Sequence, residues 1–153
     1  MIIEPRPATD GDLVALVAEQ EREMAQRYGG ADGGQYPVHP DAYFMVAVVG
    51  RQAVGCGAIQ PLDQDTVELK RMYVRPEFRG RGVARRLLCA LEALAISGGY
   101  SRVRLETGIR QPEAIGLYES AGYDPIPLFG PYGGNPFSRC FEKTVRTVLV
   151  ASR

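Results

Sequence analysis

The 153-residue sequence predicts a single α/β domain in which helices flank a mixed, mostly antiparallel sheet of about six to seven strands. Three observations predict this class. Runs of alternating apolar and polar residues, the period of a half-buried strand, recur along the chain. Stretches with apolar residues at helical spacing separate several of these runs. Clusters of glycine and proline mark the boundaries between the two patterns.

Composition agrees with one folded domain over residues 1–153. Apolar residues make up 45% of the chain and charged residues 24%, which is typical of soluble proteins. The 18 basic and 18 acidic residues cancel, so no overall field attracts nucleic acid or an anionic membrane. The opening MIIEPRPATD resembles no signal peptide, and no apolar run approaches the roughly 20 residues of a spanning helix. We therefore expect a cytoplasmic enzyme or binding protein.

The histidine and cysteine content excludes several kinds of active site. His39 is the only histidine, so metal sites built from several histidines are excluded. Cys56, Cys89 and Cys140 are odd in number, widely separated and without a CxxC spacing. They predict free thiols rather than a disulfide framework or a zinc site, and we expect no metal.

The N-terminal part begins with a short strand-like run at residues 2–6, followed by a helix to about Arg27. Thr9 and Asp12 have the spacing of a capping box, with Asp in the place of Glu or Gln. Glycines and a proline in the segment 29–39 then end the helix and predict a mobile loop. Such loops often shape a substrate pocket.

Three strands are predicted next. The runs 42–49 and 52–60 are joined by Gly50 and Arg51, which predicts an antiparallel hairpin. A third strand covers residues 67–74. Strict alternation along it predicts one face made of Glu68, Lys70, Met72 and Val74, and an opposite face made of Val67, Leu69, Arg71 and Tyr73.

The second half alternates between helical and strand patterns. A helix with an apolar stripe follows from Gly82 to about Ile96 and ends at a glycine pair. The remaining predicted elements are a strand at 102–107, a helix at 112–121, and strands near 123–128 and 138–145. The segment 144–153 is unassigned: its apolar residues either extend the last strand or cover a partner chain in a homodimer.

The connection between the strand 67–74 and the next helix has the features of a phosphate-binding loop. Gly80 and Gly82 allow a sharp turn and a close approach of the backbone to a ligand. The first amide groups of the following helix have no acceptor within that helix, and the helix dipole adds partial positive charge there. Five arginines surround this point, at positions 75, 79, 81, 85 and 86.

Two common phosphate loops do not fit this segment. A Walker loop needs a Lys-Ser/Thr pair after its glycine, and none is present. A dinucleotide loop needs a third glycine where this chain has Arg85. The glycines and arginines alone therefore predict a site for phosphate without naming the ligand.

The segment does resemble the R/Q-x-x-G-x-G/A signature of the GNAT superfamily of acyl-CoA-dependent N-acetyltransferases. Arg79, Gly82 and Ala84 match every defined position, and LKRMYVRPEFRGRGVARRLL is similar to that family throughout. The resemblance implies that acetyl-CoA is the cosubstrate and that the backbone near Met72 and Val74 binds its pantetheine arm. It assigns the pyrophosphate to Arg79, Gly80, Arg81, Gly82, Val83 and Ala84. The cofactor-binding core would span about residues 42–145.

A second motif lies downstream at the distance the family requires. Gln111, Ala114, Leu117, Tyr118, Gly122 and Tyr123 resemble the family pattern N-x-x-A-x-x-L-Y-x-x-x-G-[FY]. Only Gln111 departs from it, being one methylene longer than Asn, and it remains a candidate contact to the cofactor. In the family the tyrosine at the position of Tyr118 protonates the departing CoA thiolate. A phenol stays protonated at neutral pH and can do so.

The resemblance offers Glu68 as the general base, because a glutamate six residues before the equivalent of Val74 serves as base in the histone-acetylating branch. Glu106, at the end of the strand 102–107, is a second candidate, and either carboxylate can instead form a surface ion pair. The spacing leaves the choice open, since about 13 Å separates Glu68 from Met72 along an extended strand.

The predicted function is transfer of the acetyl group from acetyl-CoA to a primary amine, in the family most often that of a small molecule, by direct attack. Two alternatives stay open: acetylation of a protein amino terminus or lysine, and a non-catalytic acyl-CoA-binding sensor. Segments 29–39 and 129–137 contain glycine and aromatic residues that can line an acceptor pocket. The acceptor itself is not identified by these residues.

Overall fold

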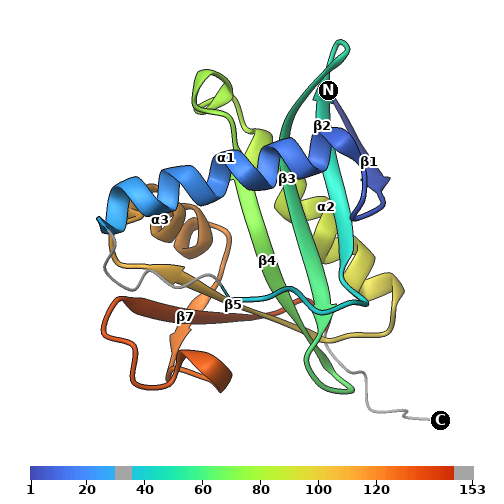
Figure 1. The fold of residues 1–153 in the computed structure, drawn as a ribbon. Helices are drawn as coiled ribbons and strands as arrows, with labels where there is room; N and C mark the ends of the chain where they lie inside the picture. The colour runs from blue at the N-terminus through green and yellow to red at the C-terminus, as the bar shows by residue number, and fades with distance from the viewer. Residues whose placement is uncertain (30–35, 147–153) are drawn as a thin grey trace, which may run out of the picture.

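The computed structural model describes residues 1–29 and 36–146, which form one seven-stranded sheet with helices on both faces (Figure 1). The strands lie in the order β1-β2-β3-β4-β5-β7-β6. They are β1 (Ile2–Arg6), β2 (Tyr43–Val49), β3 (Gln52–Pro61), β4 (Thr66–Val74), β5 (Arg102–Gly108), β6 (Asp124–Ile126) and β7 (Ser138–Thr144). The helices are α1 (Gly11–Tyr28), α2 (Val83–Ser97) and α3 (Pro112–Ser120), with short 3-10 turns η1 (Pro76–Phe78) and η2 (Gly130–Tyr132).

The predicted class and the order of elements are confirmed, with each boundary within a few residues of its expected place. The predicted loop 29–39 falls partly on residues 30–35, and the unassigned segment 144–153 falls mostly on residues 147–153. Both stretches lie outside the described residues. Among the helices that are described, none is long and apolar enough to cross a membrane.

The sheet is antiparallel except where β4 and β5 run side by side in parallel. Their pairing extends from Thr66↔Arg102 to Leu69↔Leu105 and then stops, although both strands continue. Figure 1 shows β5 and β7 running at a wide angle to the strands β1 to β4. The two strands therefore separate at their C-terminal ends, and backbone groups beyond Leu69 lack a partner strand on that side.

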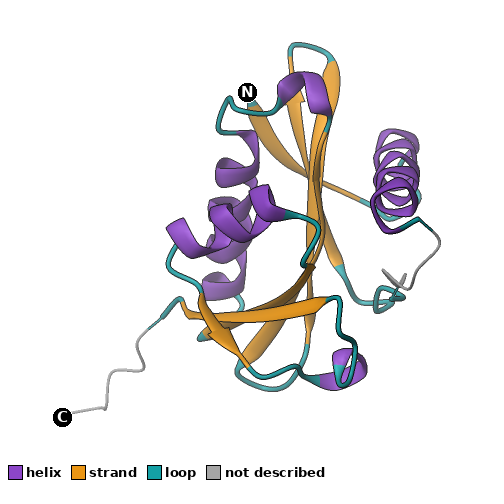
Figure 2. Ribbon diagram, turned by 90° about the vertical axis from the view of Figure 1, so that its left-hand side faces the viewer, coloured by secondary structure: helices purple, strands orange, loops and turns teal. Residues whose placement is uncertain are grey.

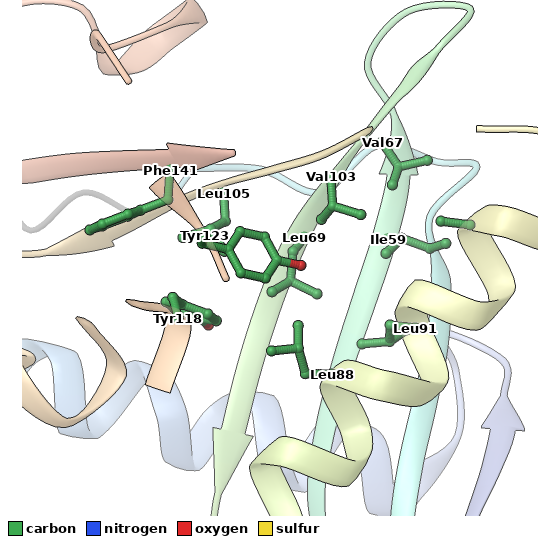
Figure 3. Packing of buried hydrophobic residues seen from close by; sticks show 11 residues of the cluster. Ile59, Val67, Leu69, Leu88, Leu91, Val103, Leu105, Tyr118, Tyr123 and Phe141 are labelled. Carbon is green, nitrogen blue, oxygen red and sulfur yellow. The ribbon is translucent and has the colours of Figure 1, made fainter. Parts of the chain in front are cut away.

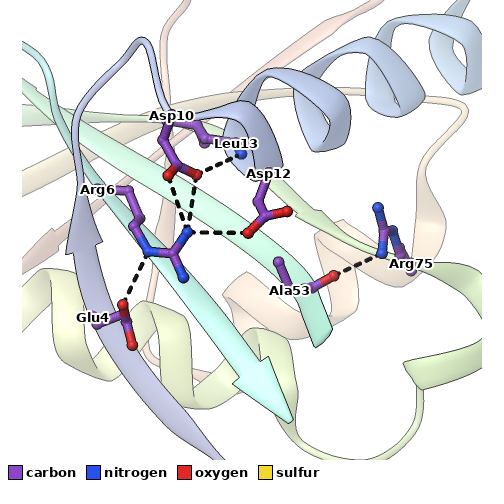
Figure 4. Close-up of polar contacts among 7 residues, drawn as sticks. All are labelled: Glu4, Arg6, Asp10, Asp12, Leu13, Ala53 and Arg75. Atoms are coloured by element: carbon purple, nitrogen blue, oxygen red, sulfur yellow. Dashed lines mark hydrogen bonds and ion pairs between the residues drawn. The ribbon is translucent and has the colours of Figure 1, made fainter. Parts of the chain in front are cut away.

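Helix α1 is capped by Asp10 rather than by the predicted pair of Thr9 and Asp12. A carboxylate oxygen of Asp10 accepts a hydrogen bond from the Leu13 amide at 3.0 Å, which satisfies one of the free amides of the first turn (Figure 4). The guanidinium of Arg6 also binds Asp10 and Asp12, and so it ties the end of β1 to the start of the helix. The hydrogen bond from Leu13 is the main cause that lowers the pKa of Asp10.

Helices cover both sides of the sheet (Figure 2) and pack apolar side chains against it. Helix α1 packs Leu13 and Leu16 against one face, with Val46, Cys56 and Tyr73 beneath them. Helices α2 and α3 lie on the opposite face. There the largest buried cluster joins residues of α2, α3 and four strands with Tyr123 (Figure 3): Ile59, Val67, Leu69, Leu88, Leu91, Ala95, Val103, Leu105, Tyr118, Tyr123 and Phe141.

A β-bulge in β4 corrects the prediction of one continuous face for Glu68, Lys70, Met72 and Val74. Arg71 has a φ of 60°, and the pairing with β3 shifts register between Cys56 and Ala58. The extra residue reverses the alternation. Met72 therefore shares the α2 face with Leu69, whereas Glu68 lies on the other face of the strand.

Candidate functional site

The first of two adjoining pockets lies where β4 ends and α2 begins, and we call it the loop pocket. Its volume is about 360 Å³. Its walls come from the end of β4, the glycine loop, the first turn of α2, and facing residues of α1 and α3. The predicted cofactor residues that line it are Met72, Val74, Arg79, Gly80, Gly82, Val83, Ala84 and Gln111. Arg81 belongs to the same loop but its side chain lies against the ring of Phe78, 5.2 Å from the ring centroid.

The backbone of the glycine loop presents a row of free donors. Gly80 and Gly82 have φ values of 76° and 80°, and a Cβ built on either would meet nothing within 4 Å. These glycines are therefore required by backbone conformation rather than by crowding. Within the described chain, the amides from Gly80 to Arg85 have no backbone acceptor, and the first bond of this turn runs from the Arg86 amide to the Gly82 carbonyl. Such an unpaired helix start binds anions.

Two of the five arginines predicted around this point are neutralised by helix α1. Arg75 forms an ion pair with Glu19 at 2.9 Å and also donates to the Ala53 carbonyl. Arg79 pairs with Glu23 at 2.7 Å, and its Nε donates to the Val74 carbonyl. These two therefore connect α1 to the end of β4. The remaining positive charge at the loop comes from Arg81, Arg85 and Arg86, for which the described residues provide no carboxylate partner.

The second pocket, which we call the inner pocket, continues from the loop pocket between the separating ends of β4 and β5. Its volume is about 120 Å³. Charged groups come from Glu21, Lys70, Arg71 and Glu106, and aromatic side chains complete the wall. The residues shared by both pockets are Gln20, Met24, Met72, Gln111, Ala114 and Tyr118. The two pockets therefore meet at the side of α1 and at the start of α3.

The two segments expected to line an acceptor pocket do meet at the inner pocket. Tyr36, Tyr132, Asn135 and Phe137 all line it. The Asn135 amide donates to the Tyr36 hydroxyl at 2.8 Å, and the rings of Tyr36 and Tyr132 pack edge to face at 4.6 Å between centroids. The described residues of the two segments therefore line one pocket, and its use by an acceptor stays a prediction.

Tyr118 lies at the junction of the pockets. Its ring is buried, and packs at 64° to the ring of Tyr123. Its hydroxyl has no hydrogen-bond partner among the described side chains and backbone groups, so it is available to a ligand. Burial raises the pKa of Tyr118, and the nearby Glu106 carboxylate adds to the effect. The phenol is therefore protonated at neutral pH.

Glu68 is buried beside the inner pocket rather than lining it. Its carboxylate accepts a hydrogen bond from the Tyr132 hydroxyl. The same hydroxyl accepts a hydrogen bond from Lys70 Nζ at 2.8 Å, and Lys70 lies 3.7 Å from the Glu68 carboxylate. Burial lowers the pKa of Lys70, an effect that Glu68 opposes. Glu68 thus holds Tyr132 and Lys70 in place.

Glu106, on β5, lines the inner pocket. Its Oε2 accepts a hydrogen bond from Ser138 Oγ at 2.6 Å. Burial raises the pKa of Glu106 above the ordinary carboxyl value, while the bond from Ser138 and the charge of Lys70 oppose that shift. A carboxylate with a raised pKa, exposed to a pocket beside Tyr118, has the properties of a general base.

None of the three cysteines has the environment of a nucleophile. Cys56 is fully buried, and burial raises the pKa of its thiol to about 12. Burial also raises the pKa of Cys140. Cys89 is exposed on α2 and lines neither pocket. A thiolate is needed for attack, and the two buried thiols stay protonated.

Sequence reasoning missed Gln20, Lys70 and Tyr132 as site residues. Gln20 lies on α1, Lys70 on β4 and Tyr132 in η2, so no short motif contains them together. Only the aromatic and glycine content of segment 129–137 pointed to that loop. The convergence of these residues on the pockets depends on tertiary packing.

Comparison with known proteins assigns the chain to a family. The model of the "Acetyltransferase (GNAT) family" matches residues 12–123. The chain is 38% identical over 136 residues to an IAA acetyltransferase of Azospirillum brasilense, covering 86% of this chain and 89% of that protein. It is 34% identical over 127 residues to the uncharacterised N-acetyltransferase YjgM of Escherichia coli, covering 72% and 75%. A crystal structure assigned as an acyl-CoA N-acyltransferase from Klebsiella pneumoniae matches with a TM-score of 0.82 and 35% identity, covering 95% and 97%. The chain belongs to the acetyltransferase (GNAT) family and is an acetyl-CoA-dependent N-acetyltransferase.

Proposed function

We propose that this protein transfers the acetyl group of acetyl-CoA to the primary amine of a small molecule by direct attack. The observation that carries the proposal is the junction of the two pockets at Tyr118 and Met72. The loop pocket has the donors for a phosphate-bearing cosubstrate, and the inner pocket has a carboxylate and aromatic walls. A thioester placed at the junction would be in reach of an amine in the inner pocket.

The cosubstrate would lie along the loop pocket. Backbone amides from Gly80 to Arg85 supply donors for the pyrophosphate, and Arg81, Arg85 and Arg86 add positive charge. The pantetheine arm would follow β4 past Val74 and Met72, in the gap left where β5 separates from β4. Gln111 and Tyr118, at the start and on the inner side of α3, would face its sulfur end.

In the proposed reaction the neutral amine attacks the thioester carbonyl carbon, so that the C–N bond forms and the C–S bond breaks. The leaving CoA sulfur gains a proton from Tyr118, and the proton that the nitrogen loses after attack restores the Tyr118 hydroxyl, directly or through water. Tyr118 suits the role of proton donor to the sulfur because its hydroxyl is protonated and its side chain lines both pockets. Direct attack fits the cysteines, since Cys56 and Cys140 have raised pKa values.

For the base, the geometry favours Glu106 over Glu68. Glu106 lines the inner pocket, whereas Glu68 is buried behind Tyr132 and bonded to it. The charges also favour an amine. Arg71 is paired with Glu21 at 3.9 Å, so when Glu106 is ionised, Lys70 is left as one cation beside the carboxylates of Glu68 and Glu106. The uncompensated negative charge would attract an ammonium group, and Glu106 would then take its proton, directly or through water.

A small acceptor is favoured by the volume of the inner pocket, about 120 Å³. Pockets for drug-sized ligands are larger, at roughly 300–1,000 Å³. Acetylation of a protein amino terminus or lysine is the alternative acceptor, and an acyl-CoA sensor is the alternative function. A cytoplasmic location and a homodimer stay predictions of the sequence.

The test is release of free CoA from acetyl-CoA in the presence of a panel of small amines and lysine-containing or free-amino-terminal peptides. Exposed Cys89 reacts with thiol reagents, so each reading needs a blank without acetyl-CoA, or the Cys89→Ser background. Tyr118→Phe should lower kcat by roughly 10²–10⁴-fold, the usual contribution of acid catalysis. Tyr43→Phe, at an exposed position of β2, is the matched control and should leave kcat unchanged.

Each contrary result has a distinct meaning. Turnover by Tyr118→Phe that equals the wild type at saturating substrates, across the pH range, removes the acid role. Acetylation of peptides in preference to every small amine moves the acceptor to proteins. Tight binding of acetyl-CoA without acetylation of any amine or peptide identifies a sensor.

A further inference from the structure

Gln20, on helix α1, contains a buried polar atom that the protein itself does not satisfy. Its Nε2 donates to the Met72 carbonyl at 2.9 Å. Its Oε1 is buried and has no hydrogen-bond partner within residues 1–29 and 36–146. The same side chain lines both the loop pocket and the inner pocket. The side chain that carries the unpaired oxygen therefore forms part of the wall shared by the two pockets.

The orientation of this amide follows from its partner. A carbonyl oxygen can only accept, so the atom facing Met72 O must be the NH2 group, and Oε1 is the acceptor left over. Buried amide oxygens in native proteins nearly always receive a donor. In this position the donor can come from a ligand that fills the pockets.

The neighbouring backbone shows which ligand group would need this acceptor. Beyond Leu69, β4 has no partner strand on the β5 side. Two carbonyl oxygens of this segment already bind side chains: Met72 O accepts from Gln20, and Val74 O accepts from Arg79 Nε at 2.8 Å. An extended ligand lying along the strand would meet Gln20 Oε1 in place of the Met72 carbonyl.

We propose that Gln20 is a positioning residue for the cosubstrate: its Oε1 accepts an amide N–H of the pantetheine arm while its Nε2 remains on the Met72 carbonyl. The inference rests on the proposed function, which places that arm along β4. The pantetheine arm carries two secondary amides and so has the required N–H donors. The ammonium of the acceptor has the same donor chemistry, and the experiment distinguishes these two sources.

The test compares Gln20→Met with the wild type in equilibrium binding of CoA and of adenosine 3′,5′-bisphosphate, which lacks the pantetheine arm. Methionine keeps the length of the side chain and removes both polar atoms. We expect CoA to bind about tenfold more weakly, equivalent to about 1.4 kcal/mol, and the bisphosphate to bind as before. Gln26→Met, at an exposed position of the same helix, is the matched control and should change neither.

Three results would overturn the inference. Equal weakening of CoA and bisphosphate would mean that the loop pocket itself is disturbed. Unchanged CoA affinity would remove the contact to pantetheine. Unchanged CoA affinity together with a raised KM for the amine would assign the oxygen to the acceptor. Should Gln20→Met unfold at the assay temperature, Gln20→Asn takes its place, since its shorter amide cannot span both contacts.

The outcomes also separate this inference from the proposed function. Unchanged CoA affinity in a variant that still releases CoA when amines are added refutes only the role of Gln20. Normal CoA binding in a wild-type protein that acetylates nothing refutes the proposed function and leaves the binding test valid.

Discussion

Replacing Gly82 with alanine tests whether backbone conformation makes the loop a phosphate site. Gly82 precedes α2 with a φ of 80°, and a Cβ there would meet no atom within 4 Å. The cost of the substitution is therefore conformational rather than steric. For an L-residue in the left-handed region this cost is about 1–2 kcal/mol.

The penalty of Gly82→Ala can appear in two places. If the loop keeps its conformation, the free energy of unfolding falls by that amount and CoA affinity is retained. If the loop relaxes instead, the amides from Gly80 to Arg85 leave their positions, and CoA affinity falls by roughly 5–30-fold. Either way, the free energy between the unfolded chain and the CoA-bound protein should fall by about 1–2 kcal/mol.

The free energy between the unfolded chain and the CoA-bound protein is the sum of two measured values. Chemical denaturation of the free protein gives the free energy of unfolding, and calorimetric titration gives the free energy of CoA binding. Gly116→Ala is the matched control, because Gly116 is exposed inside α3 and a Cβ there also meets nothing within 4 Å. Alanine in a helix interior should stabilise the protein by up to about 1 kcal/mol without changing CoA affinity. A Gly82→Ala protein with unchanged stability and unchanged CoA affinity would refute the reasoning.

Two further predictions concern the inner pocket. Burial raises the pKa of Glu106, so the folded protein binds this proton more tightly than the unfolded chain does. The stability from this group is therefore greatest below the ordinary carboxyl pKa and is lost as pH rises through the raised value. In urea denaturation from pH 4 to 8, Glu106→Gln should gain stability over the wild type across that window. Parallel plots of unfolding free energy against pH for the two proteins would contradict this. Tyr132→Phe removes the hydroxyl between Lys70 and Glu68 and should lower the free energy of unfolding by about 1–3 kcal/mol. Tyr43→Phe, at an exposed position, should leave the free energy of unfolding unchanged. Equal free energies of unfolding for the two variants would exclude a stabilising role for the hydrogen bonds of the Tyr132 hydroxyl.

The loop and its flanking elements were predictable because their determinants are local. Gly80 and Gly82 permit a backbone that other residues resist, and the helix that follows must leave its first amides free. The spacing from Arg79 to Tyr118 is likewise a property of the chain alone. Hydrophobic periodicity then located the strands and helices to within a few residues.

The face of Glu68 was not predictable, because the bulge occurs at Arg71, a residue that rarely has a positive φ. Nothing in the sequence around Arg71 marks the extra residue. The bulge results from pairing with β3, where the register shifts between Cys56 and Ala58. Pairing between strands is a tertiary property, and it moved Glu68 away from the face of Met72.

The sequence by itself determined the fold class, the phosphate loop and the family to which the loop belongs, since each depends on residues close together in the chain. Tertiary structure alone decided which groups share the inner pocket. Gln20, Glu106 and Tyr132 come from three distant segments, and only the separation of β5 from β4 and the crossing of α1 bring them to the two adjoining pockets. The same packing decided that Glu106 faces the inner pocket while Glu68 is held beneath Tyr132.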